Sequence, residues 1–405
     1  MPEFNCRIAT IAGEVVQKTY VAVDESTLRR ELESQELLLL DVRRRNPALQ
    51  GLLRTLHIRP RVAARDFLFF NQELRALIRA GLPIVPSLDI LLERRKHKVF
   101  RAALLDIRDR VKAGESLSEA FGAQGPLFPK LYAASLASGE RSGELANVLE
   151  RYVAYQHNVL ALRRKVISAL VYPAVLLSLS FGLILAMVFF IIPKFKTFLS
   201  EFGTDLPWIT EAILALSLAA RTHALPLFAL AAGGLTAFLW WNRTERGRLA
   251  VDGFKLRIPV VGRVIHDYAQ NRFTRTLGTL QAGGIPLVVS LDLAARAVGN
   301  AVFERALLQV AERVREGQAL WESLDHTALL SDIAVQMIKV GESTGALDEM
   351  LKSASDFTDE EIDAQLTRMM SLFEPLMLLF IAVVVALMLL SVYYPLIQLY
   401  GRTTM

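Results

Sequence analysis

The stretch from Phe70 to Leu91, FNQELRALIRAGLPIVPSLDIL, occurs a second time from Phe273 to Ala294 as FTRTLGTLQAGGIPLVVSLDLA. The register continues beyond these segments, with VKAG at 111–114 matching VREG at 314–317. After the loss of one residue, Gly139-Glu140 matches Gly341-Glu342 and Pro173 matches Pro375. Self-similarity over so long a stretch indicates that one structural unit has been duplicated.

Each copy has the periodicity of helices. Phe70, Leu74, Leu77 and Ile78 follow the i, i+4, i+7, i+8 spacing of a buried helix face. The residues that mark helix ends also fit short helices: Gly81 precedes Pro83, Gly114 fits a helix end, and Ser116 with Glu119 forms a capping-box pattern. Ala319 replaces that serine in the second copy, so its cap is weaker. We therefore expect two antiparallel bundles of five or six short helices, at residues 62–165 and 265–368.

Three uncharged runs are long enough to cross a bilayer, which needs about 20 apolar residues. They lie at 166–192, 223–242 and 371–397. The middle run contains Pro226 and a glycine pair and ends in Trp240-Trp241, which suit a membrane helix with an interfacial end. We therefore expect three transmembrane helices, two of which belong to the duplicated unit.

The basic residues beside these runs predict an orientation. Nine lysines and arginines flank the ends facing residues 1–165 and 243–370, and four flank the other ends. The positive-inside rule then places the N-terminus and both bundles in the cytoplasm, with a periplasmic hairpin at 193–222 and a periplasmic C-terminus. The unpaired middle span returns the chain, so that both copies face the same way.

The composition agrees with a membrane protein that also has folded domains. The chain has 405 residues, of which 53% are hydrophobic and 21% charged, and a formal net charge of +5. Charges are scattered through the first thirty residues, which argues against a cleaved signal peptide. The single cysteine, Cys6, excludes an internal disulfide, and with only six scattered histidines it argues against a structural zinc site.

Residues 1–60 differ from the rest of the chain. FNCRIAT and EVVQKTYVAV alternate like short strands around Gly13 and precede a helical ESTLRRELESQ segment and an apolar run. The predicted fold class is therefore an all-α membrane protein, with two repeated cytoplasmic antiparallel helical bundles, three transmembrane helices and a small N-terminal α/β appendage.

The turn after each bundle's penultimate helix is the first candidate site. Both copies keep a glycine, a glutamate and a second glycine: Gly139, Glu140 and Gly143, and Gly341, Glu342 and Gly345. We interpret the first glycine as a helix end and the glutamate as a polar anchor of a structural turn, with a docking surface for a partner as the alternative. The second copy also satisfies the G-x-S-x-G pattern of hydrolases, but no histidine follows Ser343 and the first copy breaks the pattern, so we interpret this match as fortuitous.

Charged clusters form the other candidates. The basic run from Arg94 to Lys98, including Arg95 and Lys96, and a second at 43–45 predict a solvated face near anionic lipid, or a partner site. The acidic residues at 356–363 predict a solvated helix face, with metal or basic-partner binding as the alternative. Glu374 beside Pro375 stands at a membrane edge, where an ionisable group is expensive; packing or capping is the first interpretation, and an assembly contact or proton relay the second.

No motif for enzymatic chemistry occurs in the sequence. A Walker A loop, a dinucleotide fingerprint, H-E-x-x-H and an EF-hand loop are all missing, as are modules for binding nucleic acid. We expect no catalytic residue, no metal, no cofactor and no nucleic-acid partner.

Taken together, the motifs resemble the type II secretion F / PilC family. The resemblance rests on the paired F-x-x-x-L-x-x-L-x-x-A/G-G-[LI]-P-[IL] segments, the paired G-E turns, IIPKFKTFLSEFGTDLPWIT after the first span, and FEPLMLL at the third. It implies a non-enzymatic, oligomeric platform in the bacterial inner membrane, between a cytoplasmic hexameric assembly ATPase and pilin or pseudopilin subunits, together with other inner-membrane assembly proteins. The family's motifs do not separate secretion from pilus machines. The rival interpretation is a small oligomeric transporter or channel, although the spans contain no charged pathway.

Overall fold

The computed structural model describes residues 3–9, 15–21, 38–44, 62–95, 97–186, 224–259 and 261–403. The chain divides into two compact units, Met1–Arg61 and Val62–Met405. In the first unit, the described residues form an antiparallel sheet of order β2-β1-β3, from β1 (Glu3–Ala9), β2 (Val15–Val21) and β3 (Leu38–Arg44). The first two strands fall where the alternating pattern predicts them. The helix expected between them and the apolar run lies outside the described residues, so the α/β character of the appendage stays a prediction.

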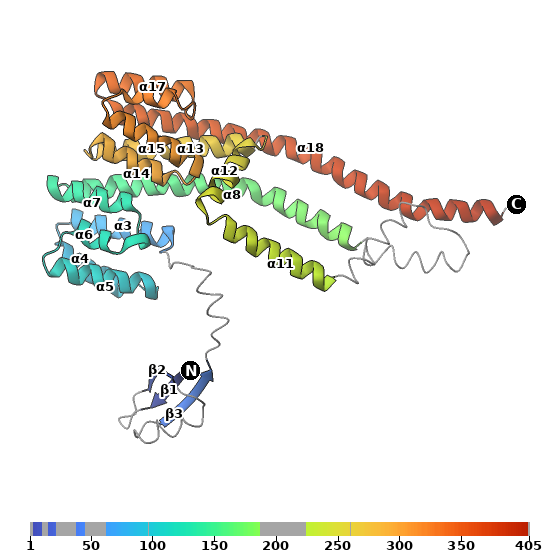
Figure 1. Ribbon diagram of the computed structural model, residues 1–405, viewed down its shortest axis with the longest axis horizontal. Helices are drawn as coiled ribbons and strands as arrows, with labels where there is room; N and C mark the ends of the chain where they lie inside the picture. Colours follow the sequence, from blue (N-terminus) through green and yellow to red (C-terminus); the bar gives the residue numbers. More distant parts are fainter. Residues whose placement is uncertain are drawn as a thin grey trace. The chain divides into compact units, whose positions relative to one another are not determined.

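The second unit contains the duplicated helices (Figure 1). Repeat 1 consists of α3 (Ala64–Arg79), α4 (Ile84–Glu93), α5 (Lys98–Lys112), α6 (Leu117–Ala123), α7 (Lys130–Ser142) and α8 (Leu145–Ala186). Repeat 2 consists of α13 (Val261–Ala282), α14 (Leu287–Ala297), α15 (Ala301–Arg315), α16 (Leu320–Asp325), α17 (Asp332–Thr344) and α18 (Leu347–Thr403). Between the repeats lie α11 (Ala224–Trp241) and α12 (Glu245–Arg257). The helices of the two repeats correspond one to one, which confirms the duplication.

Local sequence signals explain where these helices begin and end. Gly81 and Gly114 have positive φ angles of 85° and 100°, as expected just beyond the ends of α3 and α5. Ser116 and Glu119 form the predicted capping box at the start of α6. At the equivalent start of α16, Ala319 makes no side-chain hydrogen bond, so the weaker cap predicted for the second copy is confirmed.

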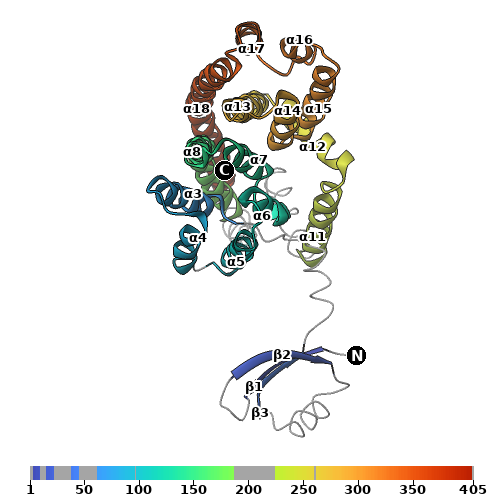
Figure 2. The same cartoon turned by 90° about the vertical axis from the view of Figure 1, so that its left-hand side faces the viewer.

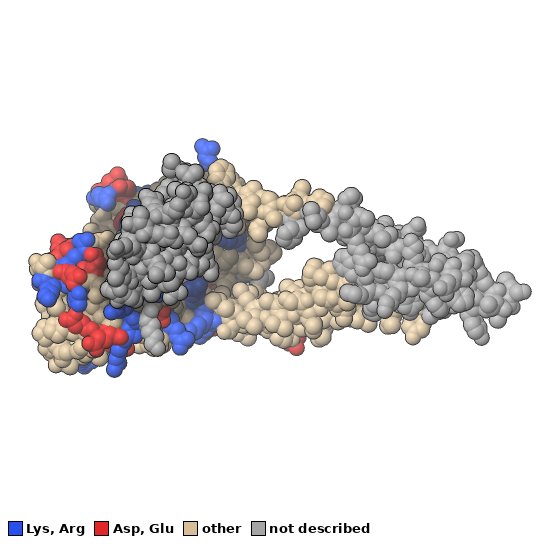
Figure 3. Space-filling model, turned by 90° about the horizontal axis from the view of Figure 1, so that it is seen from below, with Lys and Arg blue, Asp and Glu red and all other residues tan. Residues whose placement is uncertain are grey.

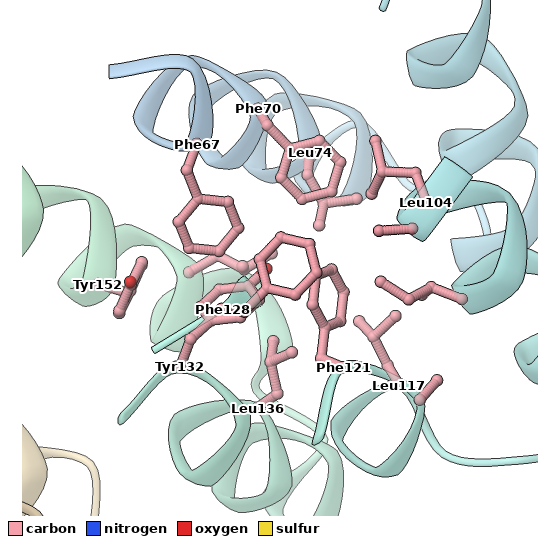
Figure 4. Close-up of a cluster of buried hydrophobic side chains, with 14 of the residues drawn as sticks. Phe67, Phe70, Leu74, Leu104, Leu117, Phe121, Phe128, Tyr132, Leu136 and Tyr152 are labelled. Carbon is pink, nitrogen blue, oxygen red and sulfur yellow. The ribbon is translucent and has the colours of Figure 1, made fainter. Parts of the chain in front are cut away.

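The two repeats have different cores. The core of repeat 1 is aromatic (Figure 4). The Tyr132 ring lies edge-on to those of Phe67 and Phe121, with centroids 4.9 Å apart in both pairs, and the Phe67 and Phe128 centroids are 5.1 Å apart. In repeat 2 the positions of Phe67, Phe121, Phe128 and Tyr132 are occupied by Gln270, Leu324, Leu330 and Ala334. A buried polar seam replaces the aromatic packing there, in which the Gln270 Nε2 group donates to the hydroxyls of Ser331 and Thr358 at 3.1 Å each. The two bundles therefore have the same helices but different core residues.

Two helices extend far beyond the bundles. α8 has 42 residues and α18 has 57, so each is continuous from the last helix of its bundle into an apolar segment. Only 6% of the most apolar window of each is buried, whereas a core helix of a soluble domain would be mostly covered. On the face in Figure 3, the charged side chains gather over the bundles, and the tan helices that extend away carry almost none. Among the described residues, α8 and α18 are therefore the two candidate membrane spans; α11, also apolar, is shorter.

The repeats pack against each other close to these long helices. Leu162 of α8 joins Ile362 and Leu366 of α18 in one buried cluster, and the Lys165 Nζ atom lies 2.5 Å from a carboxylate oxygen of Asp363. Nearer the tips of the bundles, Leu280 and Ile285 of repeat 2 are buried in the core of repeat 1. The two bundles thus form one body, with both long helices leaving it on the same side (Figure 1).

Candidate functional site

The paired turns α7–α8 and α17–α18 have the same geometry. The Glu140 carboxylate accepts hydrogen bonds from the backbone N–H groups of Leu117 (2.5 Å) and Ser118 (3.2 Å). The Glu342 carboxylate accepts from those of Leu320 (2.8 Å) and Trp321 (3.0 Å). These are the first N–H groups of α6 and α16, which have no acceptor inside their own helices. Each glutamate therefore caps the preceding short helix from across the bundle.

The first glycine of each turn allows a close approach between helices. A Cβ atom at Gly341 would lie 2.9 Å from the Leu347 Cα atom and 2.9 Å from the Met350 Cβ atom. At Gly139 it would lie 3.0 Å from Val148. The prediction that these glycines end their helices is wrong, because both lie inside α7 and α17, which continue for three more residues. They are needed because the next long helix packs directly on them.

The second glycine of each turn is the one that ends the helix. Gly143 and Gly345 are the C-cap residues of α7 and α17, in the left-handed conformation with φ of 73° and 75°. A Cβ atom would meet nothing within 4 Å at either position, so the requirement for glycine is conformational. The three retained residues of each turn thus have three separate structural tasks.

These intramolecular hydrogen bonds explain why both turns keep a glutamate, and no partner protein is needed for that explanation. The side chains that point outward from the turns are different residues, Arg141 and Glu144 in repeat 1 and Ser343 and Thr344 in repeat 2, all of which are exposed. The Ser343 hydroxyl donates to the Val340 carbonyl within α17, and this residue lies inside a helix rather than on the turn between a strand and a helix that a hydrolase elbow requires. A partner-binding role of the turns stays a prediction, and it belongs to these outward residues rather than to Glu140 and Glu342.

The basic run after α4 is not a uniform solvated patch. Arg94 is exposed, but the side chain of Arg95 is only 13% exposed and is paired with Glu73. Its guanidinium lies 5.7 Å from the ring centroids of both Phe70 and Phe100. Arg95 therefore covers the aromatic core of repeat 1, and its interpretation as a solvated residue is wrong. Lys96 lies outside the described residues.

The acidic stretch of α18 also has specific partners. The Arg275 Nη2 group lies 2.6 Å from Asp359 and 3.3 Å from Asp356, and Asn271 donates to Asp359 at 2.9 Å. Burial raises the pKa of the Asp359 carboxyl, although Arg275 opposes this shift, and burial raises the pKa of Glu361 as well. The stretch is therefore a packed seam between α13 and α18 rather than only a solvated face. Among the described residues no group of histidine, cysteine or acidic side chains is placed to hold a metal ion.

Glu374 and Pro375 lie within the continuous helix α18, at the start of its apolar segment. Both are exposed, and within the described part of the chain Glu374 makes no hydrogen bond or ion pair. No described residue caps or pairs the carboxylate, and a role in assembly stays a prediction.

Sequence reasoning missed the residues that join the two repeats. The Ser138 hydroxyl donates to the Gly283 carbonyl at 2.5 Å, Arg151 donates to the Ala282 carbonyl, and the hydroxyls of Tyr155 and Thr276 are 3.1 Å apart. None of these pairs has a sequence signal of its own, because each joins residues more than 120 positions apart. A comparison of the two copies was the one available signal, since Ser138 and Tyr155 correspond to the apolar Val340 and Phe357, but it does not point to their partners.

Two repeats of six helices, the last of which continues into a long apolar segment, define a duplicated helical membrane protein. Residues 70–193 and 273–395 each match the sequence profile of the family described as Type II secretion system (T2SS), protein F. The chain is 32% identical to the type IV pilus assembly protein PilC of Myxococcus xanthus over 399 residues, covering 98% of this chain and 95% of that protein. It is also 32% identical to the type II secretion system protein F of Xanthomonas campestris, covering 98% and 99%, and 30% identical to PilC of Thermus thermophilus, covering 99% of each. The chain therefore belongs to the type II secretion F / PilC family.

Proposed function

We propose that the protein is the inner-membrane platform of a type IV pilus or type II secretion machine. The observation that carries the proposal is the match of both bundle-and-helix units, across nearly the whole chain, to relatives named for these two machines. Relatives of the two kinds are about equally similar to the chain, so the proposal covers the shared platform and not one machine.

The proposed topology has three spans, α8, α11 and α18, with the bundles and the N-terminus in the cytoplasm and the C-terminus in the periplasm. Its support is that α8 and α18 leave the bundles in the same direction, while α11 runs back towards them (Figure 1). Two parallel crossings of a bilayer need an intervening crossing in the opposite direction, and α11 supplies one of 18 residues, none of them charged. The arginines and lysine of α12 directly follow α11, as expected of a cytoplasmic flank.

In the proposed mechanism the protein passes motion from a cytoplasmic ATPase to pilin or pseudopilin subunits in the membrane, and has no catalytic step of its own. Each bundle is fused to its span through an uninterrupted helix, and the bundles are locked together by the Leu162–Ile362–Leu366 cluster and the Lys165–Asp363 pair. A push on either bundle is therefore carried into both long helices as a rigid-body displacement. The exposed apolar faces of α8 and α18 offer packing surface to the apolar helix of a subunit. Self-association and contacts with other inner-membrane assembly proteins complete the proposed set of partners.

The test is photo-crosslinking in cells of the native organism. Photoreactive residues replace the exposed Arg141 and Ser343, which leaves the capping glutamates intact, and in separate variants Leu179 and Leu379 of the apolar helices. We expect the ATPase to be captured from the bundle positions and pilin-like subunits from the span positions. Capture of neither, with the protein inserted at its normal level, would contradict the proposal.

A further inference from the structure

The contact between the two repeats is one-sided. The turn between α13 and α14 of repeat 2 enters repeat 1, where Leu280 and Ile285 are buried in the core at 0% and 5% exposure. It lies against α7 and α8, through the hydrogen bonds of Ser138 and Arg151 described above. Among the residues that the structure describes, none of repeat 1 joins the main core cluster of repeat 2 in return. Each repeat has both surfaces of this head-to-tail contact, but repeat 1 uses only one of them and repeat 2 only the other. The equivalent surface in the opposite repeat is left without a partner in each case.

The first unused surface is the outer face of α17. Its residues Ile333 and Val340 are the repeat equivalents of Leu131 and Ser138 on α7. Leu131 is 5% exposed, but Ile333 is 47% and Val340 50% exposed. In Figure 2, α7 lies beside α14, whereas α17 lies at the far edge of repeat 2 with no helix beyond it. Val340 stands where Ser138 forms the contact with Gly283, so this outward face is apolar at its centre.

The second unused surface is the turn between α3 and α4 of repeat 1. Leu77, Leu82 and Ile90 are the equivalents of Leu280, Ile285 and Leu293 of the inserted turn. Ile90 is 41% exposed, and Leu77 and Leu82 are half-buried, although the residues equivalent to these two are fully covered in repeat 2. Ala80, at the position of Gly283, is exposed as well. The turn thus has the apolar residues of the inserted one, but no bundle among the described residues receives it.

We infer that the α17 face of one copy of this chain binds the α3–α4 turn of a second copy, by the same contact that joins the two repeats within the chain. The inference deepens the self-association included in the proposed function and rests on that function for the membrane orientation. The contact is compatible with insertion of both copies in one bilayer. The rotation and translation that superpose repeat 1 on repeat 2 carry α8 onto α18, and these two helices run in the same direction (Figure 1). A second copy placed on α17 by the same movement therefore has its spans parallel to those of the first. At the centre, Ala80 meets Val340, an apolar replacement for the Gly283–Ser138 hydrogen bond.

Disulfide trapping tests this contact directly in membranes. Cys6 is the only cysteine, so the full-length Cys6→Ser chain provides a cysteine-free background. Two differently tagged copies are expressed together, one with Val340→Cys and the other with Ala80→Cys, in a host that lacks the rest of the machine. We expect mild oxidation to give a mixed disulfide that carries both tags. A matched pair, Val340→Cys with Arg101→Cys on the exposed side of α5, should give none.

An internal control keeps the test decisive. Ser138→Cys with Gly283→Cys in one chain should form the intramolecular disulfide of the known contact and so report a folded protein. If this control forms and the Val340–Ala80 pair does not, or if the Arg101 control pair forms equally well, the inference is overturned. Capture of a different protein at Val340 in the native organism, in place of a second copy, would overturn it too.

A charge exchange provides a second measurement. Val340→Glu alone and Ala80→Lys alone should each reduce the self-associated fraction, measured by the mass of the detergent-solubilised protein, and the two together should restore it. Loss without restoration would contradict the pairing of these two positions. Because neither readout needs the ATPase or the pilins, failure of the contact is distinguishable from failure of the platform proposal.

Discussion

Removing the Glu342 carboxylate should loosen the start of α16 more than the matched change loosens α6. In Glu342→Ala, the N–H groups of Leu320 and Trp321 lose acceptors at 2.8 and 3.0 Å. Ala319 provides no side-chain cap to replace them. In Glu140→Ala, by contrast, the Ser116 hydroxyl still accepts from the Glu119 N–H group at 3.2 Å.

The magnitude follows from the kind of bond that is lost. A hydrogen bond to a charged group contributes about 1.5–3 kcal/mol, and the lower end applies here because both glutamates are only half-buried and water solvates part of the released amides. We therefore expect local opening of α16 to become easier by about 2 kcal/mol, or about 30-fold in the opening equilibrium. For α6, where one cap remains, we expect about 1 kcal/mol, or about fivefold.

Hydrogen–deuterium exchange of the full-length protein in detergent, read at peptides covering 318–326 and 115–123, measures both effects in one experiment. Glu342→Gln serves as the graded control, because an amide NH2 group, which cannot accept a hydrogen bond, replaces one of the two accepting oxygens. A change below threefold in the α16 peptide of Glu342→Ala, or a larger effect in α6 than in α16, would refute the capping argument.

Five further substitutions test the same geometry. Gly341→Ala should destabilise the protein by about 1–3 kcal/mol through overpacking against Leu347 and Met350, and Gly345→Ala by about 1–2 kcal/mol through left-handed backbone strain. Urea unfolding in detergent measures both changes. An unchanged free energy of unfolding in Gly341→Ala would contradict the close approach of the two helices. Ala319→Ser should stabilise repeat 2 by about 0.5–1 kcal/mol, because it completes a capping box with Glu322, and Ser116→Ala should destabilise repeat 1 by a similar amount. Equal melting temperatures for the wild type and the two variants would count against this. Because burial raises the pKa of Asp359 in the folded state, its contribution to stability is present below the unfolded pKa of about 3.9 and is lost as pH rises through the higher folded value. Asp359→Asn should remove that part of the pH dependence of unfolding, and an unchanged profile would be the contrary result.

The sequence was sufficient to predict the parts of the fold that depend on local signals and on the duplication. Helix faces such as Phe70 and Leu74, the capping box at Ser116 and the missing cap at Ala319 all depend on residues close together in the chain. The family motifs identified the protein's class for the same reason. Each of these signals is contained in one short segment or in its repeat.

Features that depend on tertiary contacts were missed or misinterpreted. Gly139 resembles a helix end in sequence, and only the packing of α8 against it shows that it lies inside a helix. Arg95 belongs to a run of charges, yet it covers Phe70 and Phe100 because α4 ends above the aromatic core. The insertion of the α13–α14 turn into repeat 1 depends on the rotation between the copies, which no periodicity encodes.

Removal of the protein tests most directly whether the chain is the membrane platform of a pilus or secretion machine. In a strain that lacks it, surface pili and the secreted proteins are measured, and then measured again after the wild-type chain is supplied in trans. We expect one of the two outputs to be lost while the assembly ATPase and pilin-like subunits are still made, and the wild-type chain to restore it. Normal pili together with normal secretion in the deletion strain would contradict the platform proposal.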